Sequence, residues 1–215
     1  MSTLVQMLTD TGLALPDETC ERLEVFLDEM LRWNKQINLT AITGREEALE
    51  KHLVDALTVL PLLVGNERLL DLGSGGGVPG IPLKLALNGL DLLSVDAVAK
   101  KILFQRQVAR KLKLTGFEAW HGRAEDLPRR EGVREGFNVV ISRAFASLVD
   151  FARLAEPFLR PGGRAFAMKG PEGEREVADA EVVLRGIGLM PSERMTVKLP
   201  RSQAMRTLIV LKKDN

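Results

Sequence analysis

The sequence holds few of the residues that build disulfides and metal sites. Its one cysteine, Cys20, has no second thiol to pair with, which excludes an internal disulfide. The two histidines, His52 and His121, lie far apart along the chain and lack the spacing of metal ligands. These absences predict a protein of a reducing compartment that holds no metal.

Long apolar runs and an excess of one charge are also missing. No stretch of about 18 apolar residues occurs, and no positive segment followed by an apolar one opens the chain, so we expect a cytoplasmic protein. The 30 basic residues nearly cancel the 29 acidic ones, which excludes a histone-like polycation. Any nucleic acid must therefore be bound by a local basic patch. A composition of 45% apolar residues over 215 residues indicates a folded domain with a sizeable core.

Two regions differ in their hydrophobic pattern. From Pro16, apolar residues recur every three or four positions and predict an amphipathic helix, and a further helical stretch follows over residues 46–63. We assign residues 1–65 to an N-terminal helical extension and residues 66–215 to an α/β domain. In that domain short apolar runs alternate with helix-like segments, which predicts a mostly parallel sheet with helices on both faces.

The expected elements of the α/β domain follow from this alternation. The predicted strands are residues 69–72, 90–95, 117–121, 139–142 and 164–168, and the predicted helices are residues 80–87, 98–113, 147–159 and 173–187. Two last strand-like runs, residues 190–198 and 205–212, have only a short loop between them. They predict an antiparallel hairpin at the edge of the sheet.

Four glycines within five residues follow the first predicted strand of the sheet. They are Gly73, Gly75, Gly76 and Gly77. Glycine allows the backbone to turn sharply and to approach a ligand closely, and open α/β sheets bind ligands at the carboxyl ends of their strands. The turn therefore predicts a ligand site, with a merely flexible loop as the alternative.

Phosphate ligands fit this turn poorly. A G-x-G-x-x-G pattern ends at Gly80, and Asp96 ends the next strand, so a dinucleotide site is formally allowed. However, Pro79 and Pro82 remove amide N–H groups that a diphosphate needs at the start of the helix. A Walker A loop fails as well, because Ile81 and Pro82 stand where lysine and serine or threonine are required.

A positively charged nucleoside suits the turn better. Asp71 would lie near a cation, and Asp96 would accept hydrogen bonds from both ribose hydroxyls. S-adenosylmethionine combines these groups. The alternatives are that Asp71 only caps the turn and that Asp96 only caps the following helix. Backbone groups of Ala124 and Glu125, after the third strand, are expected over the adenine, unless this segment is simply a polar surface turn.

Five sequence motifs together carry a family resemblance over essentially the whole chain. They are Trp33–Lys35 with Asn38–Thr40, His52–Leu57, Asp71–Pro82, Ile141–Ala146 and Met168–Gly170. In their order and spacing they resemble the ribosomal RNA small subunit methyltransferase G family (glucose-inhibited division protein B), within the class I S-adenosylmethionine-dependent methyltransferases. The resemblance implies a Rossmann-like fold with a seven-stranded sheet, the cofactor S-adenosyl-L-methionine, and N7-methylation of one guanine in 16S ribosomal RNA. The cofactor contacts that it implies are Gly73, Val78, Ala124, Glu125 and Arg143. Gly75 and Gly77 are predicted as further cofactor contacts from the glycine turn itself.

The residues present agree with guanine N7 as the methyl acceptor. Methylation of a pyrimidine C5 uses a thiolate, but Cys20 is predicted on the N-terminal helix, far from the turn. The Asn/Asp-Pro-Pro-aromatic loop of enzymes that methylate the adenine amino group is replaced by Ser142–Phe145. Because N7 has a lone pair and no hydrogen, its attack needs no general base, and positioning should provide most of the acceleration. We therefore predict no catalytic acid or base.

Single side chains around the predicted crevice have competing interpretations. Arg143 is expected to orient the cofactor or the guanine, and a salt bridge at the strand end is the alternative. Phe145 either stacks on a base or belongs to the core, and Trp33 is expected to pack. His52 is expected to hydrogen-bond Asp55, three residues further on, and to have no acid–base role.

Basic residues outside the turn must attract the RNA. Lys35, Lys169, Arg201 and Arg206 are predicted to surround the mouth of the crevice, and the run of six basic residues from Lys100 to Lys113 is either a second patch or a solvated helix face. We expect a monomer that acts on free 16S ribosomal RNA or on the small ribosomal subunit, without a membrane partner. Two other functions stay open, a non-catalytic RNA-binding or assembly factor with a nucleoside pocket and an NAD-dependent oxidoreductase.

Overall fold

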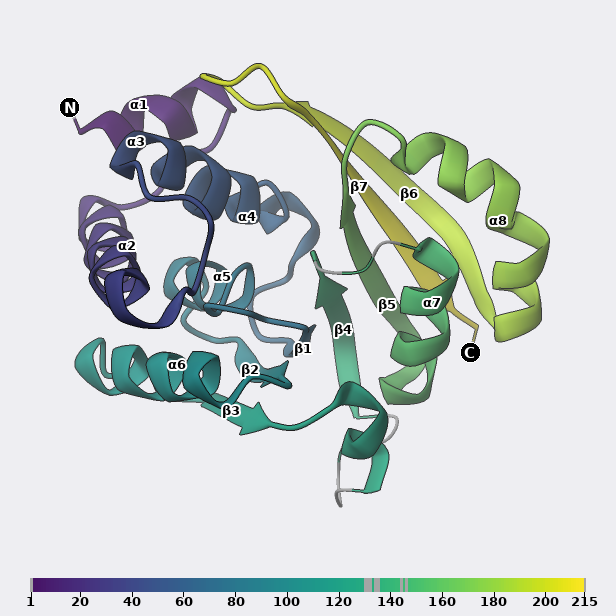
Figure 1. The fold of residues 1–215 in the computed structure, drawn as a ribbon. Coiled ribbons are helices and arrows are strands. Elements are labelled where there is room, and N and C mark those ends of the chain that lie inside the picture. Colours follow the sequence, from purple (N-terminus) through teal and green to yellow (C-terminus); the bar gives the residue numbers. More distant parts are fainter. Residues whose placement is uncertain (1, 130–132, 134–135, 144, 146, 215) are drawn as a thin grey trace.

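A seven-stranded sheet forms the centre of the protein, with strand order β3-β2-β1-β4-β5-β7-β6 (Figure 1). The computed structural model describes residues 2–214 apart from 130–132, 134–135, 144 and 146. The strands are β1 (Arg68–Leu72), β2 (Asp91–Asp96), β3 (Phe117–His121), β4 (Phe137–Ser142), β5 (Leu159–Lys169), β6 (Leu189–Lys198) and β7 (Met205–Lys213). Neighbouring strands are parallel except that β7 runs antiparallel to both β5 and β6. The predicted α/β fold with a hairpin at the sheet edge is therefore confirmed.

Helices cover both faces of this sheet. The longer ones are α1 (Thr3–Asp10), α2 (Asp17–Ile37), α5 (Gly80–Ala86), α6 (Ala99–Lys111), α7 (Leu148–Ala155) and α8 (Gly173–Ile187). Short ones are α3 (Arg45–Ala48), the π-helix η1 (Leu49–Val54), α4 (Asp55–Leu57) and the 3-10 turns η2 (Leu60–Leu62), η3 (Ala124–Arg129) and η4 (Glu156–Phe158). In Figure 1, α7 and α8 lie on one side of the sheet, and α5, α6 and the N-terminal helices lie on the other. Among the described residues, no helix is both long and apolar enough to cross a membrane.

The central strands explain this two-sided covering. Along β1 and β4 nearly every residue is buried, as expected for parallel strands with helices on both faces. Leu70 and Val140, which are paired in register, pack in the cluster that contains α7 and α8. Their neighbours Leu69 and Val139 pack on the other face with Leu83 of α5. The alternation of strand side chains thus places one hydrophobic cluster on each face.

The N-terminal helices share a third hydrophobic cluster with α5 and α6. Leu4 of α1, Phe26 of α2 and Phe104 of α6 are fully buried in it, and so is Leu199 from the tip of the β6–β7 hairpin. Helix α1 was not predicted, although Ser2 caps it by accepting a hydrogen bond from the N–H of Val5. The predicted boundary after residue 65 stays a prediction, since this buried cluster continues across it.

The order of the strands fixes where a ligand crevice opens. From β1 the chain adds β2 and β3 on one side and then returns to place β4 on the other side of β1. Such a switch point leaves a crevice at the carboxyl ends of the strands on either side. The glycine turn after β1, Asp96 at the end of β2 and Arg143 after β4 all lie at this edge.

Candidate functional site

The glycine turn wraps tightly around the carboxyl end of β1. Gly73, Gly75 and Gly77 have positive φ angles of 68°, 57° and 83°, a conformation that other residues rarely adopt. A Cβ on Gly77 would lie 2.4 Å from Cδ1 of Ile81, whereas a Cβ on Gly75 would meet no atom within 4 Å. The turn is therefore packed against α5 on one side and open on the other.

Asp96 holds this turn through backbone hydrogen bonds. Its Oδ2 accepts a 2.8 Å hydrogen bond from the N–H of Gly75, and its Oδ1 accepts one of the same length from the N–H of Val98 at the start of α6. The hydrogen bond from Val98 lies just before α6, whose N-cap is Val98 and which has no side-chain cap, so the predicted helix cap is not present. Each carboxylate oxygen has a second lone pair, so both retain capacity for ligand hydroxyls.

Gln105 also holds the glycine turn, a role that was not predicted from the sequence. Its buried Nε2 donates 2.8 Å hydrogen bonds to Oγ of Ser74 and to the carbonyl of Gly75. The signal was a glutamine on the apolar face of α6, between the buried residues Ile102 and Val108. A buried amide at such a position needs polar partners, and the glycine turn provides them.

Asp71 lies buried below the turn. Its Oδ2 accepts a 2.9 Å hydrogen bond from the N–H of Gly80, while its Oδ1 forms no hydrogen bond with the described residues. Burial raises the pKa of Asp71 to about 7, although the Gly80 hydrogen bond and the charge of Arg143 oppose this shift. The structure therefore supports the capping interpretation, and an interaction with a bound cation stays a prediction.

Three adjoining hollows lie along the carboxyl edge of the sheet. The first, which we call the strand-end hollow, has a volume of about 320 Å³. Its lining includes Gly73, Asp96, Ala97, Gly122, Arg123, Ala124, Glu125 and Phe145. The hollow thus brings together four residues predicted to bind the cofactor, namely Gly73, Asp96, Ala124 and Glu125.

The second hollow, the glycine hollow, adjoins the first at Gly73 and has a volume of about 220 Å³. Its lining includes Met30, Thr40, His52, Gly73, Ser74, Gly75, Gly76, Val78 and Arg143. Three further predicted cofactor residues, Gly75, Val78 and Arg143, therefore lie here. Asp71 and Gly77 line neither hollow.

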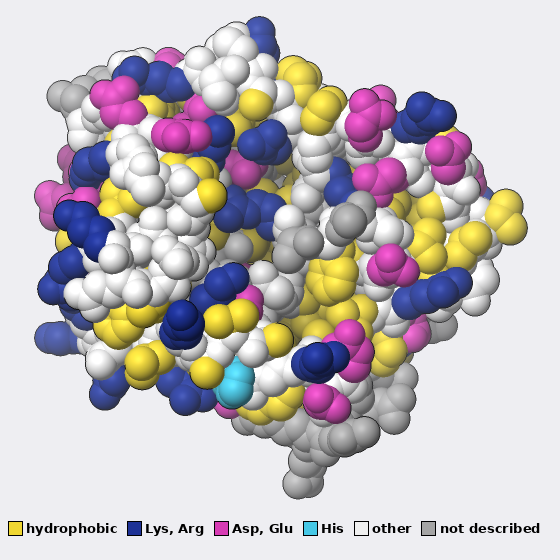
Figure 2. Space-filling view, viewed as in Figure 1, with side chains coloured by type: hydrophobic (Ala, Val, Ile, Leu, Met, Phe, Trp, Pro, Cys, Tyr) yellow, Lys and Arg dark blue, Asp and Glu magenta, His cyan; other side chains and the backbone are white. Residues whose placement is uncertain are grey.

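The third hollow, the arginine hollow, adjoins the second at His52 and Arg143. It has a volume of about 280 Å³, and its lining includes Lys51, His52, Asp55, Arg143, Met168, Lys169, Gly170 and Arg206. Figure 2 shows a cleft in this face of the molecule with Lys and Arg side chains inside it. Each hollow shares at least one lining residue with the next, so the three lie side by side, and we call them together the groove.

A buried carboxylate links two arginines of the third hollow. Nη1 of Arg143 lies 3.5 Å from Oδ2 of Asp55, and Nε of Arg206 lies 3.2 Å from its Oδ1. Burial raises the pKa of Asp55, although both guanidinium groups oppose this shift. The salt bridge that was the alternative for Arg143 is therefore present, and the same side chain also lines two of the hollows.

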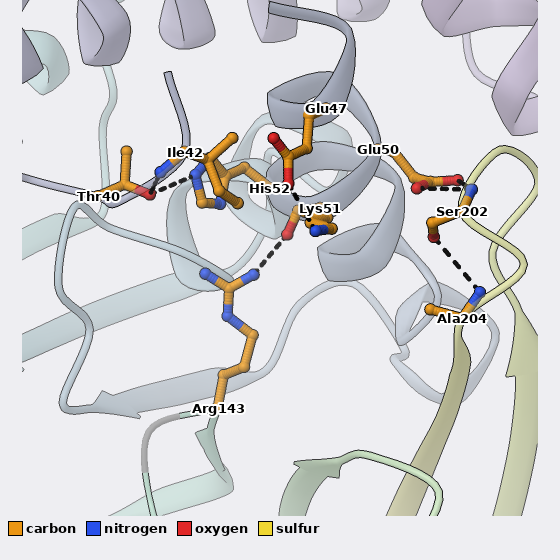
Figure 3. Close-up of polar contacts among 9 residues, drawn as sticks. All are labelled: Thr40, Ile42, Glu47, Glu50, Lys51, His52, Arg143, Ser202 and Ala204. Atoms are coloured by element: carbon orange, nitrogen blue, oxygen red, sulfur yellow. Dashed lines mark hydrogen bonds and ion pairs between the residues drawn. The ribbon is translucent and has the colours of Figure 1, made fainter. Parts of the chain in front are cut away.

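The π-helix η1 joins this cluster to other parts of the chain, as Figure 3 shows. Arg143 donates a 2.7 Å hydrogen bond to the carbonyl of Lys51. The buried carboxylate of Glu50 accepts a 2.9 Å hydrogen bond from the N–H of Ser202 in the β6–β7 hairpin. A π-helix is an unusual element that occurs often at functional sites.

The prediction for His52 was wrong in its partner. Nε2 of His52 lies 3.0 Å from Oγ1 of Thr40, and the carboxylate of Asp55 interacts with the two arginines instead. The π-helical turn changes the offset between residues three apart, so His52 and Asp55 do not meet as they would on an α-helix. Burial and the charge of Arg143 lower the pKa of His52 to about 4, which keeps the imidazole neutral at physiological pH.

The other predicted side chains divide between the groove and the rest of the molecule. Lys169 lines the arginine hollow, where its Nζ lies 2.8 Å from Oε2 of Glu176. Arg201 lies at the hairpin tip, 3.3 Å from Oε2 of Glu46. Lys35 is exposed near the end of α2, and its place at the crevice stays a prediction. Ala144 and Ala146, which belong to the motif Ile141–Ala146, lie outside the described residues.

The two aromatic residues pack against other rings. Phe145 is half-buried, with its ring centre 5.8 Å from that of Phe151, and it also lines the strand-end hollow. Its core interpretation is supported without excluding a contact with a ligand. Trp33 packs 5.8 Å from the ring centre of Phe104, so the prediction of a packing role is confirmed.

Comparison with known proteins gives a family over most of the chain. The family model "rRNA small subunit methyltransferase G" matches residues 19–200. The ribosomal RNA small subunit methyltransferase G of Syntrophotalea carbinolica is 52% identical over 98% of this chain and 96% of its own length. The protein of the same name from Geobacter sulfurreducens is 46% identical over 93% of this chain and 91% of its own length.

Solved structures share the fold at low sequence identity. M. jannaschii TYW2 in complex with AdoMet aligns with a TM-score of 0.61 at 13% identity and covers 76% of each chain. A SAM dependent methyltransferase from Aquifex aeolicus aligns with a TM-score of 0.58 at 14% identity, over 77% of this chain and 92% of that one. These similarities show that the sheet and its helices form the fold of such enzymes.

Proposed function

Because the chain belongs to the ribosomal RNA small subunit methyltransferase G family, we propose that it transfers a methyl group from S-adenosylmethionine to N7 of one guanine in 16S ribosomal RNA. Ribosomal RNA methylation and the cofactor follow from the family. The choice of N7 is the finer step. It is what the family resemblance implies, and the chemistry of the residues around the groove agrees with it. The observation that carries the proposal is the adjacency of the three hollows, which provides adjoining places for a nucleoside, a methyl donor and an acceptor base.

The strand-end and glycine hollows fit the cofactor. S-adenosylmethionine supplies an electrophilic methyl group on a positively charged sulfur. Asp96 would accept hydrogen bonds from the ribose, and the backbone of Ala124 and Glu125 would contact the adenine. Gly75 leaves open space beside the glycine hollow for a ligand to approach the backbone closely.

A diphosphate would find no free amides at the start of α5. The N–H of Gly80 bonds Asp71, the N–H of Ile81 bonds the carbonyl of Gly77, and Pro82 has none. Helix N-termini bind phosphate through free N–H groups, so this arrangement counts against a nicotinamide dinucleotide. It supports the methyltransferase over the oxidoreductase.

The arginine hollow fits a guanine whose N7 is left free to react. Arg143 would donate to the O6 edge of the base, while Asp55 and the Lys51 carbonyl hold its guanidinium group. The pKa of His52 is lowered to about 4, so its imidazole is a weak base, and its Nε2 lies against Thr40. The thiol of Cys20 is buried in the N-terminal cluster. Neither side chain offers a base or a nucleophile, which suits an acceptor that loses no proton. The chain would act by holding N7 about 3–3.5 Å from the methyl carbon.

The proposal also covers the RNA contacts, the form of the substrate, the oligomeric state and the division of the chain into two regions. Lys169 and Arg206 would contact the RNA from within the arginine hollow, and Arg201 and Lys35 from its surroundings. The substrate is either free 16S ribosomal RNA or the small subunit. We also expect a monomeric, cytoplasmic enzyme without a metal, in which residues 66–215 form the methyltransferase domain and residues 1–65 a helical extension.

Methyl transfer to small subunits that lack the modification tests the proposal. The purified protein, S-adenosylmethionine with a labelled methyl group and unmodified subunits should give one labelled base. Cleavage at 7-methylguanine followed by primer extension should then stop at a single guanine, and fully modified subunits are the control. Binding of S-adenosylhomocysteine without turnover would indicate the assembly factor instead, and binding of NAD in its place would indicate the oxidoreductase.

A further inference from the structure

A separate groove lies between α6 and β3, at the amino end of that strand. It has a volume of about 560 Å³, and its charged lining comes mainly from Arg106, Arg110 and Lys113. Phe117 and Ala119 of β3 form the opposite wall. None of the residues that line the three hollows at the carboxyl edge lines this groove.

The charge of this α6–β3 groove is strongly positive. Arg106 and Arg110 are four residues apart on one side of α6, Lys113 follows two residues after the end of that helix, and all three are exposed. Helix α6 contains no acidic residue, and Glu118 is the acidic side chain in the lining. Figure 2 shows Lys and Arg side chains gathered over the lower left of the molecule, where Figure 1 places α6.

Cations near the end of a helix also stabilise its dipole, which provides a purely structural role for them. That role accounts for Arg110 and Lys113 at the end of α6, but it does not account for a concave surface that they share with an aromatic side chain. A groove lined by cations and one aromatic ring is typical of surfaces that follow a nucleic-acid backbone.

The hydrogen bonds at the edge of β3 distinguish between two ligands for the α6–β3 groove, an RNA and a peptide that would add a strand to the sheet. Within the described part of the chain, β3 is the outer strand and pairs only with β2. Nε and Nη2 of Arg106 donate hydrogen bonds of 3.0 and 2.8 Å to the carbonyl of Ala119. A peptide that extended the sheet would need such a carbonyl, so Arg106 blocks it. Two of the five guanidinium N–H groups serve this contact, and the other three leave donor capacity for an anion.

We propose that the α6–β3 groove binds the phosphate backbone of the ribosomal RNA substrate, outside the segment that enters the site. The inference rests on the proposed function for the identity of the RNA. From Phe117 along β3 to Gly122, where the strand-end hollow begins, the chain extends by about 17 Å at about 3.3 Å per residue. The strand-end hollow would hold the cofactor, and the guanine would lie beyond it in the arginine hollow. An RNA that also occupies the α6–β3 groove must therefore extend beyond the methylated guanine.

The test removes two charges from the groove. The variant Arg110→Gln with Lys113→Asn leaves the contact between Arg106 and Ala119 in place. Asparagine suits position 113, because Lys113 has a positive φ of 50°. The matched control is Arg175→Gln with Arg185→Gln, which removes two exposed charges from α8. Binding to protein-free 16S ribosomal RNA and to intact small subunits is measured over a salt series for all three proteins, together with binding of S-adenosylhomocysteine.

Loss of two phosphate contacts should lower the slope of log affinity against log salt by about 1.4–1.8. Between about 50 and 200 mM salt, the groove variant should then lose about 7–12-fold less affinity than the parent and the control. Salt slopes of the groove variant equal to those of the parent would overturn the proposal. A reduced slope with intact subunits but not with protein-free RNA would also overturn it, because it would indicate that the groove binds a ribosomal protein. These measurements of RNA binding do not depend on methyl transfer. A failure of this proposal can therefore be distinguished from a failure of the proposed activity.

Discussion

Gln105 of α6 donates a 2.8 Å hydrogen bond to Oγ of Ser74, which lies 31 residues earlier in the glycine turn. The same amide group bonds the carbonyl of Gly75, so one side chain fixes two consecutive residues of the turn. Gly75 is in turn held from the other side by Asp96. The shape of the glycine turn, where we propose that the cofactor binds, therefore depends on a helix residue that lines none of the three hollows.

Replacing Gln105 with leucine should weaken cofactor binding. The variant removes two buried hydrogen bonds and leaves Ser74 Oγ and the Gly75 carbonyl with fewer partners, at a cost of about 1–3 kcal/mol in the free energy of unfolding. We expect the Kd for S-adenosylhomocysteine, measured by calorimetry, to rise about tenfold, which corresponds to about 1.4 kcal/mol. Gln107→Leu, on the exposed side of the same helix, is the control. An unchanged Kd in a stably folded Gln105→Leu protein would contradict the positioning role.

Asp71 should make the free protein less stable as the pH rises. Because the pKa of Asp71 is raised to about 7 in the folded state, the folded chain keeps a proton that the unfolded chain releases near pH 4. The stabilisation is complete below the unfolded value and is lost as the pH rises through about 7. In Asp71→Asn this loss is absent, so its free energy of unfolding relative to the parent should increase between pH 5 and pH 8, by a few kcal/mol at most. Urea unfolding at both pH values measures this, and two parallel pH curves would count against it.

His52 should have the opposite effect, at lower pH. Its pKa is lowered to about 4, so between the ordinary value near 6.5 and about 4 the unfolded chain takes up a proton that the folded chain does not. Stability is therefore full above that window and falls as the pH decreases through it. The variant His52→Gln should lose less stability between pH 6.5 and pH 4 in urea unfolding, and His121→Gln, at an exposed position, is the control. If both variants follow the parent, the burial of His52 has no effect on acid stability.

The sequence predicted the sheet well because its strands carry a strong local signal. A strand that is buried on both faces has a short, continuous run of apolar residues, and such a run can be recognised in the sequence. The strand predicted over residues 139–142 accordingly lies within β4. The hairpin was also predicted, from two strand-like runs without a helix between them. The start of α2 at Asp17 agreed with the acidic first turn after Pro16.

The sequence did not reveal contacts between distant segments. Glu50 and Ser202 are 152 residues apart, and nothing local in either segment indicates that they are hydrogen-bonded. The π-helix over Leu49–Val54 was not predicted, because hydrophobic periodicity was interpreted with the 3.6-residue period of an α-helix and does not distinguish a short π-helix within it. Its changed offset is the reason why His52 meets Thr40 and not Asp55. The sequence therefore predicted which loops follow the strands at this edge, but not the contacts that the N-terminal helices make beside them. The binding roles of these residues stay predictions.

The arginines of the hairpin provide a test of how the groove attracts RNA. Arg206 lines the arginine hollow beside Asp55, and Arg201 lies at the hairpin tip beside Glu46. Neither lines the strand-end or the glycine hollow. The double variant Arg201→Ala with Arg206→Ala should therefore bind 16S ribosomal RNA more weakly, with the salt slope reduced by about 1.4–1.8, while cofactor binding is unchanged.

The single variants separate the two arginines. Arg206→Ala also removes one of the two cations beside the buried carboxylate of Asp55, so it should lower the free energy of unfolding by about 1–3 kcal/mol. The ion pair of Arg201 is exposed, so Arg201→Ala should change the free energy of unfolding by less than about 1 kcal/mol. Salt titrations of RNA binding and urea unfolding measure the two effects independently. Equal salt slopes for the double variant and the parent would show that these side chains serve the fold alone. A reduced slope in Arg201→Ala alone would place the RNA at the hairpin tip and not in the arginine hollow.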